Sequence, residues 1–591
     1  MANVNVTVNG IKVSVPDNYT ALQAAHEAGV DIPTLCFLKD VNEVAACRVC
    51  VVEVDVRGKA VKNLPTSCTL KVEEGMNIRT NTPRVRRAVR TNVELILANH
   101  KRECLTCVRS GNCELQKICR DLGIDKIRFE GEKRDLPVDS LSTSIVRDPS
   151  KCILCGRCVN TCRDVQGIGV LDFTNRGFKT EIAPAYHFSM RDVECVYCGQ
   201  CIHACPVGAL HEKSNVEDVF AALNDPKKHV VVQTAPAVRV SLGEEFGLPM
   251  GTRVTGKMVA ALRRLGFDRV FDTNWSADLT IMEEANELLH RINNGGALPM
   301  ITSCSPGWIR FCEINYPEFI PNLSTCKSPQ QMFGAISKSY YAEKAGIDPK
   351  DIVCVSVMPC TSKKFECSRP EMEVDGIRDV DISITTRELG DMIKKAHIRF
   401  DMLPDEQPDP IMGDYTGAGA IFGVTGGVME AALRTAADTL SGKDLPDFEY
   451  KECRGLQGIK EATVTLDVQG KPMDVKIAIA NGTKNAAALL DAVKAGEKEL
   501  HFIEIMACPS GCIHGGGQSI VSAQRRMFEG NPKVARSQSM YDEDESRVRR
   551  KSHKNPEIIA LYKDYLGEPL GEKSHHLLHT HYAPRDTYVK K

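Results

Sequence analysis

Cysteine is the residue whose number and spacing say most about the chemistry of this chain. Sixteen of its 25 cysteines lie within the first 205 of 591 residues. Eight of them form two runs, each with gaps of two, two and three residues: Cys152, Cys155, Cys158 and Cys162, then Cys195, Cys198, Cys201 and Cys205. Thiolates at this spacing are typical ligands of [4Fe-4S] clusters. The spacing therefore indicates a chain of iron-sulfur clusters rather than disulfides, zinc fingers or a reactive thiol.

The tandem runs resemble a bacterial ferredoxin with two clusters, which we expect over residues 141–214. In that arrangement the fourth cysteine of each run binds the cluster of the other run. One [4Fe-4S] cluster would be held by Cys152, Cys155, Cys158 and Cys205. The second would be held by Cys195, Cys198, Cys201 and Cys162.

Residues 1–80 carry a further cysteine group in a different setting. Alternating apolar residues flank Asn9-Gly10, a dipeptide that favours a hairpin turn, and Thr20 is placed to cap a helix over residues 21–28. With four cysteines following, the segment resembles a plant-type [2Fe-2S] ferredoxin domain, although ten residues rather than four separate the first two. Zinc is the alternative. The expected ligands are Cys36, Cys47, Cys50 and Cys68.

Residues 81–140 are expected to begin with a helix over residues 84–99. It leads to a mixed ligand set: His100, Cys104, Cys107 and Cys113. Three cysteines and one histidine could equally hold structural zinc. Because the set lies between other cluster modules, we favour a His-ligated [4Fe-4S] cluster, which leaves Cys119 without a role.

The composition excludes several classes of protein. Lys and Arg number 75 against 77 Asp and Glu, so no net field favours nucleic acid or an anionic membrane. No stretch approaches the roughly 18 apolar residues of a membrane span, and the first residues lack the features of an export signal. Many cysteines in such a chain suit a reducing compartment. We therefore expect a cytoplasmic protein.

The second half of the chain predicts an α/β catalytic domain over residues 229–525. Apolar runs typical of buried strands, at residues 230–233, 352–357 and 502–505, alternate with amphipathic helices such as residues 279–293. Residues 526–591 are polar, with one expected helix over residues 556–566. Their histidines are metal candidates, with surface packing as the default: His575, His576, His579 and His581. The expected fold is multidomain, α+β and α/β, with ferredoxin-like domains before the catalytic domain.

Three segments of the α/β half place cysteine beside glycine, proline and lysine. They read Thr-Ser-Cys-Ser-Pro-Gly-Trp at 302–308, Met-Pro-Cys-Thr-Ser-Lys-Lys at 358–364 and Met-Ala-Cys-Pro-Ser-Gly-Cys-Ile-His-Gly-Gly-Gly-Gln at 506–518. Together with the order of the cluster modules, they resemble the long clostridial-type [FeFe]-hydrogenases over essentially the whole chain. The resemblance implies an H-cluster, which is a [4Fe-4S] cube joined through one cysteine sulfur to a two-iron unit with CO, cyanide and a dithiolate amine.

The resemblance also implies roles for individual residues. Cys512 matches the bridging cysteine, and Cys360 and Cys508 match further cube ligands. Lys363 would donate a hydrogen bond to a cyanide ligand, and the glycines at 515–517 would let the backbone pass close to a bulky inorganic group. The positions that match the wall of the two-iron pocket are Ala235, Pro236, Ala237, Gln330, Met358, Phe422 and Met506.

One position departs from the family pattern, which is Thr-Ser-Cys-Cys-Pro with the first cysteine relaying protons and the second binding the cube. Here Cys304 takes the first place and Ser305 the second. The fourth cube ligand could be Cys304, Ser305 or Cys326. We favour Cys304, because thiolate is the softer ligand.

Charged residues on one helix supply a proton relay. Glu284, Glu287 and Arg291 are spaced three and four residues apart and share a helix face, a pattern that alone predicts a surface salt bridge. The resemblance instead assigns them to a relay: Cys304, Glu284, Ser324, Glu287 and Arg291. Glu283 lies on another face and is expected to be dispensable.

The implied activity is the reversible conversion of protons and electrons to H2. Electrons would pass to or from ferredoxin through one [2Fe-2S] and three accessory [4Fe-4S] clusters, and maturation enzymes would assemble the H-cluster. The alternative is the catalytic subunit of a multisubunit NAD(P)-reducing or electron-bifurcating hydrogenase with a flavoprotein partner. A hydrogenase-like iron-sulfur scaffold protein is a more distant alternative.

Overall fold

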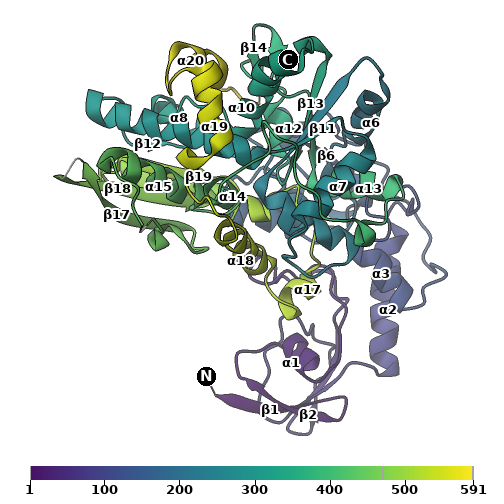
Figure 1. Ribbon diagram of the computed structural model, residues 1–591. Coiled ribbons are helices and arrows are strands. Elements are labelled where there is room, and N and C mark those ends of the chain that lie inside the picture. Colours follow the sequence, from purple (N-terminus) through teal and green to yellow (C-terminus); the bar gives the residue numbers. More distant parts are fainter. Residues whose placement is uncertain (1, 447, 469–470, 589–591) are drawn as a thin grey trace.

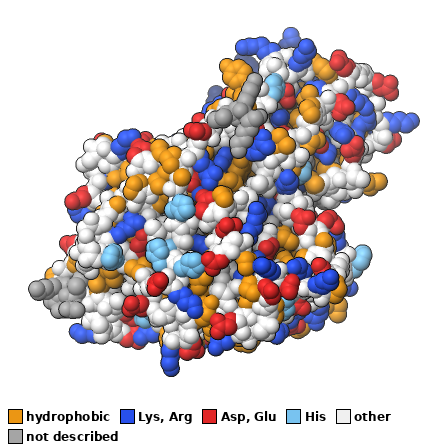
Figure 2. Space-filling model, turned by 90° about the horizontal axis from the view of Figure 1, so that it is seen from above, with side chains coloured by type: hydrophobic (Ala, Val, Ile, Leu, Met, Phe, Trp, Pro, Cys, Tyr) orange, Lys and Arg blue, Asp and Glu red, His pale blue; other side chains and the backbone are white. Residues whose placement is uncertain are grey.

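The computed structural model describes residues 2–588 except 447 and 469–470. A large body contains most of the chain, and a small amino-terminal domain projects from it (Figure 1). Lys, Arg, Asp and Glu side chains are interspersed over the face seen in Figure 2, as the net charge of −2 leads one to expect. Within the described ranges, no helix combines the length and apolar character needed to cross a membrane.

The projecting domain is built on a five-stranded sheet of order β2-β1-β5-β3-β4. Its strands are β1 (Asn3–Val8), β2 (Ile11–Pro16), β3 (Glu53–Val56), β4 (Lys59–Ala60) and β5 (Met76–Arg79). The predicted hairpin is confirmed, because Val8 pairs with Ile11 and the turn residues Asn9 and Gly10 both have positive φ. Thr20 forms a capping box at α1 (Ala21–Glu27), whose buried alanines pack on the sheet.

Two helices connect this domain to the body. They are α2 (Pro83–Ala98) and α3 (Glu114–Asp121). The helix predicted at residues 84–99 is α2, and Val85, Val89, Val93 and Leu97 form its buried stripe at four-residue intervals.

The two-cluster module has an internal repeat in its backbone. Leu154 and Gly156 in the first run, and Tyr197 and Gly199 in the second, all have positive φ, and each glycine precedes a short helix. The repeat predicted from cysteine spacing thus extends to the dihedral angles. Its elements are α4 (Arg157–Asn160), α5 (Gln200–Ala204), β6 (Ile145–Arg147) paired with β9 (Leu210–Glu212), and β7 (Asp172–Thr174) paired with β8 (Glu181–Ala183).

Two four-stranded sheets form the catalytic body. The first has the order β11-β10-β13-β16 with all strands parallel: β10 (His229–Thr234), β11 (Arg269–Asp272), β13 (Ile352–Met358) and β16 (Ile382–Thr385). The second has the order β12-β19-β18-β17: β12 (Met300–Ile301), β17 (Ile459–Val468), β18 (Lys471–Asn481) and β19 (Phe502–Met506). All three predicted strands are present, as β10, β13 and β19. Each of the three cysteine segments directly follows a strand.

Helices cover both sheets (Figure 1). The predicted helix at residues 279–293 is α8 (Thr273–Asn294), which begins six residues earlier because Asp272 caps it at the Asn274 amide. The other helices up to residue 494 are α6 (Val216–Asn224), α7 (Thr255–Leu265), α9 (Pro306–Asn315), α10 (Pro329–Ile336), α11 (Ala342–Ala345), α12 (Ser362–Glu366), α13 (Thr386–Lys395), α14 (Gly417–Ile421), α15 (Gly427–Ser441) and α16 (Thr483–Lys494). A short hairpin joins β14 (Glu373–Val374) to β15 (Ile377–Arg378).

The carboxyl-terminal segment packs into the body rather than lying on its surface. It contains α17 (Ala523–Phe528), α18 (Pro532–Glu545), α19 (Pro556–Leu561) and α20 (Glu572–Leu578). The helix predicted at residues 556–566 is α19 with a π-helical turn at Tyr562–Leu566. Met540, Leu561 and Leu578 are fully buried. Of the four histidines, His575, His576 and His581 are exposed, as expected, whereas His579 is buried.

Candidate active site

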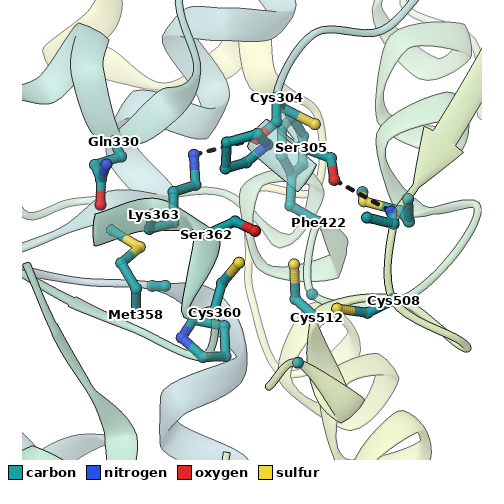
Figure 3. Close-up of a pocket in the computed structure, with 18 of the residues that line it drawn as sticks. Cys304, Ser305, Gln330, Met358, Cys360, Ser362, Lys363, Phe422, Cys508 and Cys512 are labelled. Carbon is teal, nitrogen blue, oxygen red and sulfur yellow. Dashed lines mark hydrogen bonds between the residues drawn. The ribbon is translucent and has the colours of Figure 1, made fainter. Parts of the chain in front are cut away.

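The three cysteine segments meet at one buried pocket, where the carboxyl ends of strands from both sheets come together (Figure 3). This is the edge at which α/β folds usually bind ligands. Eleven of the predicted residues line it: Ala235, Pro236, Cys304, Gln330, Met358, Cys360, Lys363, Phe422, Met506, Cys508 and Cys512. Ala237 lies behind the wall, where its carbonyl accepts a hydrogen bond from Gln518 Nε2 at 2.7 Å.

Three thiols converge within the pocket. Figure 3 shows the sulfur atoms of Cys360, Cys508 and Cys512 directed toward a common space. Burial raises the pKa of all three thiols, that of Cys512 to about 12, so their thiolate forms need a cation close by. Convergent thiols that line one pocket and must ionise to bind metal fit an iron-sulfur cluster.

Lys363 lines the same pocket, and its positive charge favours the thiolate forms of Cys360 and Cys512. It lies on α12, three residues after Cys360, and its Nζ contacts Glu366 Oε2 (2.9 Å), Ser328 Oγ (2.8 Å) and the Cys304 carbonyl (3.1 Å). These contacts use all three ammonium hydrogens. A bond from Lys363 to a cyanide ligand, which stays a prediction, would have to share one of them. The sequence interpretation missed Glu366 and Ser328, although Glu366 stands at the helical i+3 position.

Cys304 and Ser305 face different surroundings. The Ala507 amide donates to Ser305 Oγ at 3.2 Å, next to Cys508, and this hydroxyl does not cap α9 although Ser305 is its N-cap residue. In Figure 3 the Cys304 sulfur points away from the three convergent sulfurs. Cys326 does not line the pocket, and its thiol lies 3.7 Å from Glu287. The geometry thus favours Ser305 for the fourth position, while the assignment of Cys304 stays a prediction.

Three of the residues predicted as a proton relay, Glu284, Glu287 and Ser324, are buried, and Cys304 and Arg291 are half-buried. They do not form an exposed salt-bridge face. Ser324 Oγ donates to Glu287 Oε2 at 2.7 Å, and Arg291 donates to Glu287 Oε1 at 2.6 Å. Neither carboxylate oxygen of Glu284 has a hydrogen-bond partner among the described residues. Burial, followed by the charge of Glu287, raises the pKa of Glu284 to about 8. A carboxyl that titrates near neutral pH beside Cys304 is suited to carry protons.

The glycines at 515–517 make a backbone contact that the sequence interpretation did not foresee. A Cβ at Gly516 would collide with the Cys198 carbonyl and lie 2.6 Å from the Gly199 Cα. A Cβ at Gly515 would collide with the Pro359 carbonyl. These glycines therefore allow close packing between protein backbones, whereas we had attributed them to an inorganic group.

The accessory cysteines gather in the crossed sets that their spacing predicts. One cavity is lined by Cys152, Cys155, Cys158 and Cys205, and another by Cys162, Cys195, Cys198 and Cys201. In the projecting domain the Cys50 and Cys68 sulfurs lie 3.3 Å apart, and the Cys47 amide lies 3.5 Å from the Cys36 sulfur.

His100, in the set with Cys104, Cys107 and Cys113, has the properties of a metal ligand. His100 is buried, burial lowers its pKa to about 4, and its Nδ1 has no partner within the described ranges. A neutral imidazole with a free nitrogen is the form that binds metals. Cys104 is exposed, while Cys107 and Cys113 are half-buried.

Polar contacts join successive cysteine groups. Asn42 Nδ2 donates to the carbonyls of Cys36 (2.7 Å) and Cys155 (3.1 Å), and Arg109 donates to the Cys205 carbonyl (3.4 Å). Cys198 lines the catalytic pocket, and the Cys508 thiol points to its carbonyl at 3.9 Å. The cysteine groups therefore form a continuous series from the projecting domain to the pocket.

Comparisons with known proteins agree with this arrangement. Residues 228–516 match the C-terminal domain of the iron only hydrogenase large subunit, and residues 531–585 match the iron hydrogenase small subunit. The chain is 48% identical to the NADP-reducing hydrogenase subunit HndD of Solidesulfovibrio fructosivorans over 99% of its own length and 100% of the relative's. It is 45% identical to iron hydrogenase 1 of Clostridium pasteurianum, over 98% and 99% of the two chains. The chain belongs to the [FeFe]-hydrogenase family.

Other matches cover the accessory modules and the catalytic body of this hydrogenase. Residues 1–83 match a 2Fe-2S cluster binding domain, residues 90–128 an iron-sulfur binding region of NADH-ubiquinone oxidoreductase G, and residues 151–209 a 4Fe-4S dicluster domain. A solved variant of the [FeFe]-hydrogenase HydA1 from Chlamydomonas reinhardtii is 44% identical with a TM-score of 0.57, covering 63% of this chain and 99% of that one. The predicted fold class is confirmed: ferredoxin-like iron-sulfur domains precede an [FeFe]-hydrogenase catalytic domain.

The comparisons also bear on the predicted activity. The enzyme is an oxidoreductase that interconverts H2 with protons and electrons, and its domains bind [2Fe-2S] clusters, [4Fe-4S] clusters and the H-cluster. The prediction of a hydrogenase is confirmed. A cytosolic Fe-S cluster assembly factor of Danio rerio is also similar, at 34% identity over 60% of this chain.

Proposed function

We propose that this hydrogenase holds its H-cluster with Cys360, Cys508, Cys512 and a fourth group from the 304–305 pair. The observation that carries the proposal is the convergence of the Cys360, Cys508 and Cys512 thiols beside Lys363, in a pocket that Cys198 also lines. When bound, the H-cluster supplies the reversible splitting of H2 into protons and electrons. The protein binds the cluster, excludes water and moves protons and electrons to and from it.

For the fourth group we propose Ser305 in place of our initial choice, Cys304. Ser305 Oγ is held next to Cys508 by the Ala507 amide. Cys304 then keeps its relay role. Burial, followed by the charge of Glu284, raises the pKa of the Cys304 thiol, so this thiol is protonated when no cation is close by. An alkoxide is a harder ligand than a thiolate, so the cube would have one unusual iron site.

The pocket wall supports water exclusion. Met358, Phe422 and Met506 are buried and line the space beside the thiols, with Ala235 and Pro236 on another side. Gln330 is held by hydrogen bonds to Ser356 Oγ (2.8 Å) and Glu366 (2.9 Å), so its side-chain amide is fixed in the pocket wall. In such an apolar site, the few polar groups act with little screening.

For protons, we propose that Cys304 and Glu284 connect the pocket to Ser324 and Glu287. Burial and the charge of Glu287 give Glu284 a pKa of about 8, which lets it both accept and release a proton near neutral pH. Arg291 pairs with Glu287 at the outer end.

For electrons, we propose one [2Fe-2S] cluster at Cys36, Cys47, Cys50 and Cys68 and three accessory [4Fe-4S] clusters at the sets named above. The crossed cavities, the free His100 nitrogen and the module matches support these assignments. We divide the chain accordingly into residues 1–80, 81–140, 141–214, 229–525 and 526–591.

The redox partner is either a ferredoxin or a flavoprotein subunit of an NAD(P)-linked complex. The full-length similarity to an NADP-reducing hydrogenase subunit supports the second option, and that to iron hydrogenase 1 agrees with the first. Purification of the native protein decides between them, because flavin-containing chains would copurify only with a complex. We also propose a cytoplasmic location, which suits the many cysteines of the chain.

Infrared spectroscopy of the matured protein tests the central proposal. Intrinsic CO and cyanide bands, together with H2 evolution from a reduced viologen, are the expected result. A fully iron-loaded, matured preparation without these bands or this activity would contradict it. An assembly scaffold is the remaining alternative, and a similar assembly factor covers only 60% of this chain.

A further inference from the structure

The carboxyl-terminal segment reaches the outer end of the proton relay. After α20 the chain forms an antiparallel bridge between His579 and Cys326. The Lys327 amide donates to the Leu578 carbonyl at 2.7 Å, and the Thr580 amide donates to the Thr325 carbonyl at 2.8 Å. These main-chain bonds bury the His579 ring beside the relay.

The side chains at this bridge continue the relay. Thr325 Oγ1 donates to Glu287 Oε1 at 3.3 Å and lies 2.8 Å from His579 Nδ1. His579 Nε2 lies 3.1 Å from Glu283 Oε2. One carboxylate oxygen of Glu287, the Cys326 sulfur and one ring nitrogen of His579 all lie within 4.8 Å of one another.

Arg291, at the other branch of the relay, is poorly suited to pass protons on. A guanidinium does not deprotonate in proteins, and the Arg291 side chain is only 11% exposed. Its other contacts are carbonyls, those of Ala297, Pro321, Asn322 and Leu323. Arg291 can stabilise the charge of Glu287, but histidine is the side chain that titrates in the physiological range.

We propose that Glu287 exchanges protons with His579 and Glu283 through the Thr325 hydroxyl, with Arg291 as a positioning residue. In the outward direction, protonated Glu287 gives its proton to the Thr325 hydroxyl as that hydroxyl gives its own hydrogen to His579 Nδ1. The resulting imidazolium returns to neutral when its Nε2 hydrogen passes to the Glu283 carboxylate, which becomes the neutral acid. The charge count is unchanged at each transfer, and inward transfer reverses the steps.

The surroundings of His579 suit this role. Glu283 accepts hydrogen bonds from the Tyr562 hydroxyl and the Leu570 amide (2.9 Å), which fix the carboxylate that faces Nε2. His575, one helical turn earlier on α20, is exposed, and its ring stacks on His579 with centroids 4.7 Å apart. The buried imidazole is therefore one ring away from solvent. Glu283 lies off the face of α8 that carries Glu284, Glu287 and Arg291, as predicted. It is nevertheless fully buried.

Two substitutions of Thr325 form the matched test. Thr325→Val replaces the hydroxyl with a methyl group of similar shape, and Thr325→Ser keeps the hydroxyl. We expect T325V to lower H2 evolution at least about 10-fold and to raise the solvent deuterium isotope effect, while T325S restores both. His579→Gln should behave like T325V. His576→Gln, exposed on the same helix, should match the wild type.

The inference rests on the proposed relay, so the two need separate outcomes. CO and cyanide bands in each variant would show that the H-cluster is assembled. If Glu284→Gln is inactive while T325V and H579Q keep wild-type turnover and isotope effect, the exit through His579 is overturned and the relay stands. If Glu284→Gln keeps wild-type turnover, the relay itself is overturned. If T325S is as slow as T325V, the hydroxyl is not a carrier.

Discussion

The substitution Glu284→Gln tests the buried carboxyl at the centre of the relay by two independent measurements. Glutamine has nearly the shape of the neutral acid but cannot release a proton. We expect loss of H2 turnover by a factor on the order of 10² to 10⁴, with infrared bands showing that the H-cluster is still assembled. Wild-type turnover would remove Glu284 from the relay.

The second measurement is the pH dependence of stability. Burial and the charge of Glu287 raise the pKa of Glu284 from 4.5 to about 8. The folded protein therefore binds more protons than the unfolded chain between these values. The stability that this group provides is fully present below about pH 4.5 and is lost as the pH rises through about 8. The variant has no such loss.

The size of the effect follows from the shift. At about 1.36 kcal/mol per pK unit, the free energy of unfolding of the variant relative to wild type should rise by about 2 to 3 kcal/mol from pH 5 to pH 7. Urea unfolding of the apoprotein can be followed at Trp275 and Trp308, the only two tryptophans, which are both fully buried in the catalytic body. Glu343→Gln, at an exposed position of α11, is the control. A relative stability that does not change with pH would refute the argument.

Three further predictions concern two cluster ligands and the backbone packing at Gly516. Ser305→Cys should make the EPR signal of the isolated cube resemble that of an all-cysteine cluster, and Ser305→Ala should alter the signal. Cys304→Ala and Cys326→Ala should leave the signal unchanged. Loss of the signal in C304A would return the ligand role to Cys304. His100→Ala should remove one accessory [4Fe-4S] signal from the EPR spectrum of the reduced protein, because the free Nδ1 is lost, and unchanged iron content would argue against a cluster there. Gly516→Ala should lower stability by about 1 to 3 kcal/mol in thermal unfolding, since its Cβ would meet the Cys198 backbone, while Gly131→Ala, with open space around it, should have little effect.

Local patterns in the sequence predicted much of the fold. The turn at Asn9-Gly10, the cap at Thr20 and the strands before the second and third cysteine segments follow from short-range sterics and from apolar periodicity. The two-residue strand β12, before the first segment, was not predicted. The start of α8 was missed because the capping residue, Asp272, stands at the end of a strand. The crossed cysteine sets were predictable because their spacing alone fixes the ligand geometry.

Contacts between distant parts of the chain could not be predicted in this way. The spacing of Glu284, Glu287 and Arg291 predicted a shared face but not its burial, which depends on the segments that cover it. His579 is 254 residues from Thr325, and no local signal connects them. The glycines at 515–517 were noted, but the backbone they approach belongs to another module.

The orientation of the projecting domain limits how a redox partner can use it. Its sheet edge, β1 and β2, points away from the body (Figure 1). Its cysteine loop instead turns inward, where Arg157 binds the Cys36 and Phe37 carbonyls. A carrier protein docked at the tip would be separated from the metal by the thickness of the domain. A carrier protein would come closer to the cysteine loop by docking where the projecting domain meets the body, near Arg157.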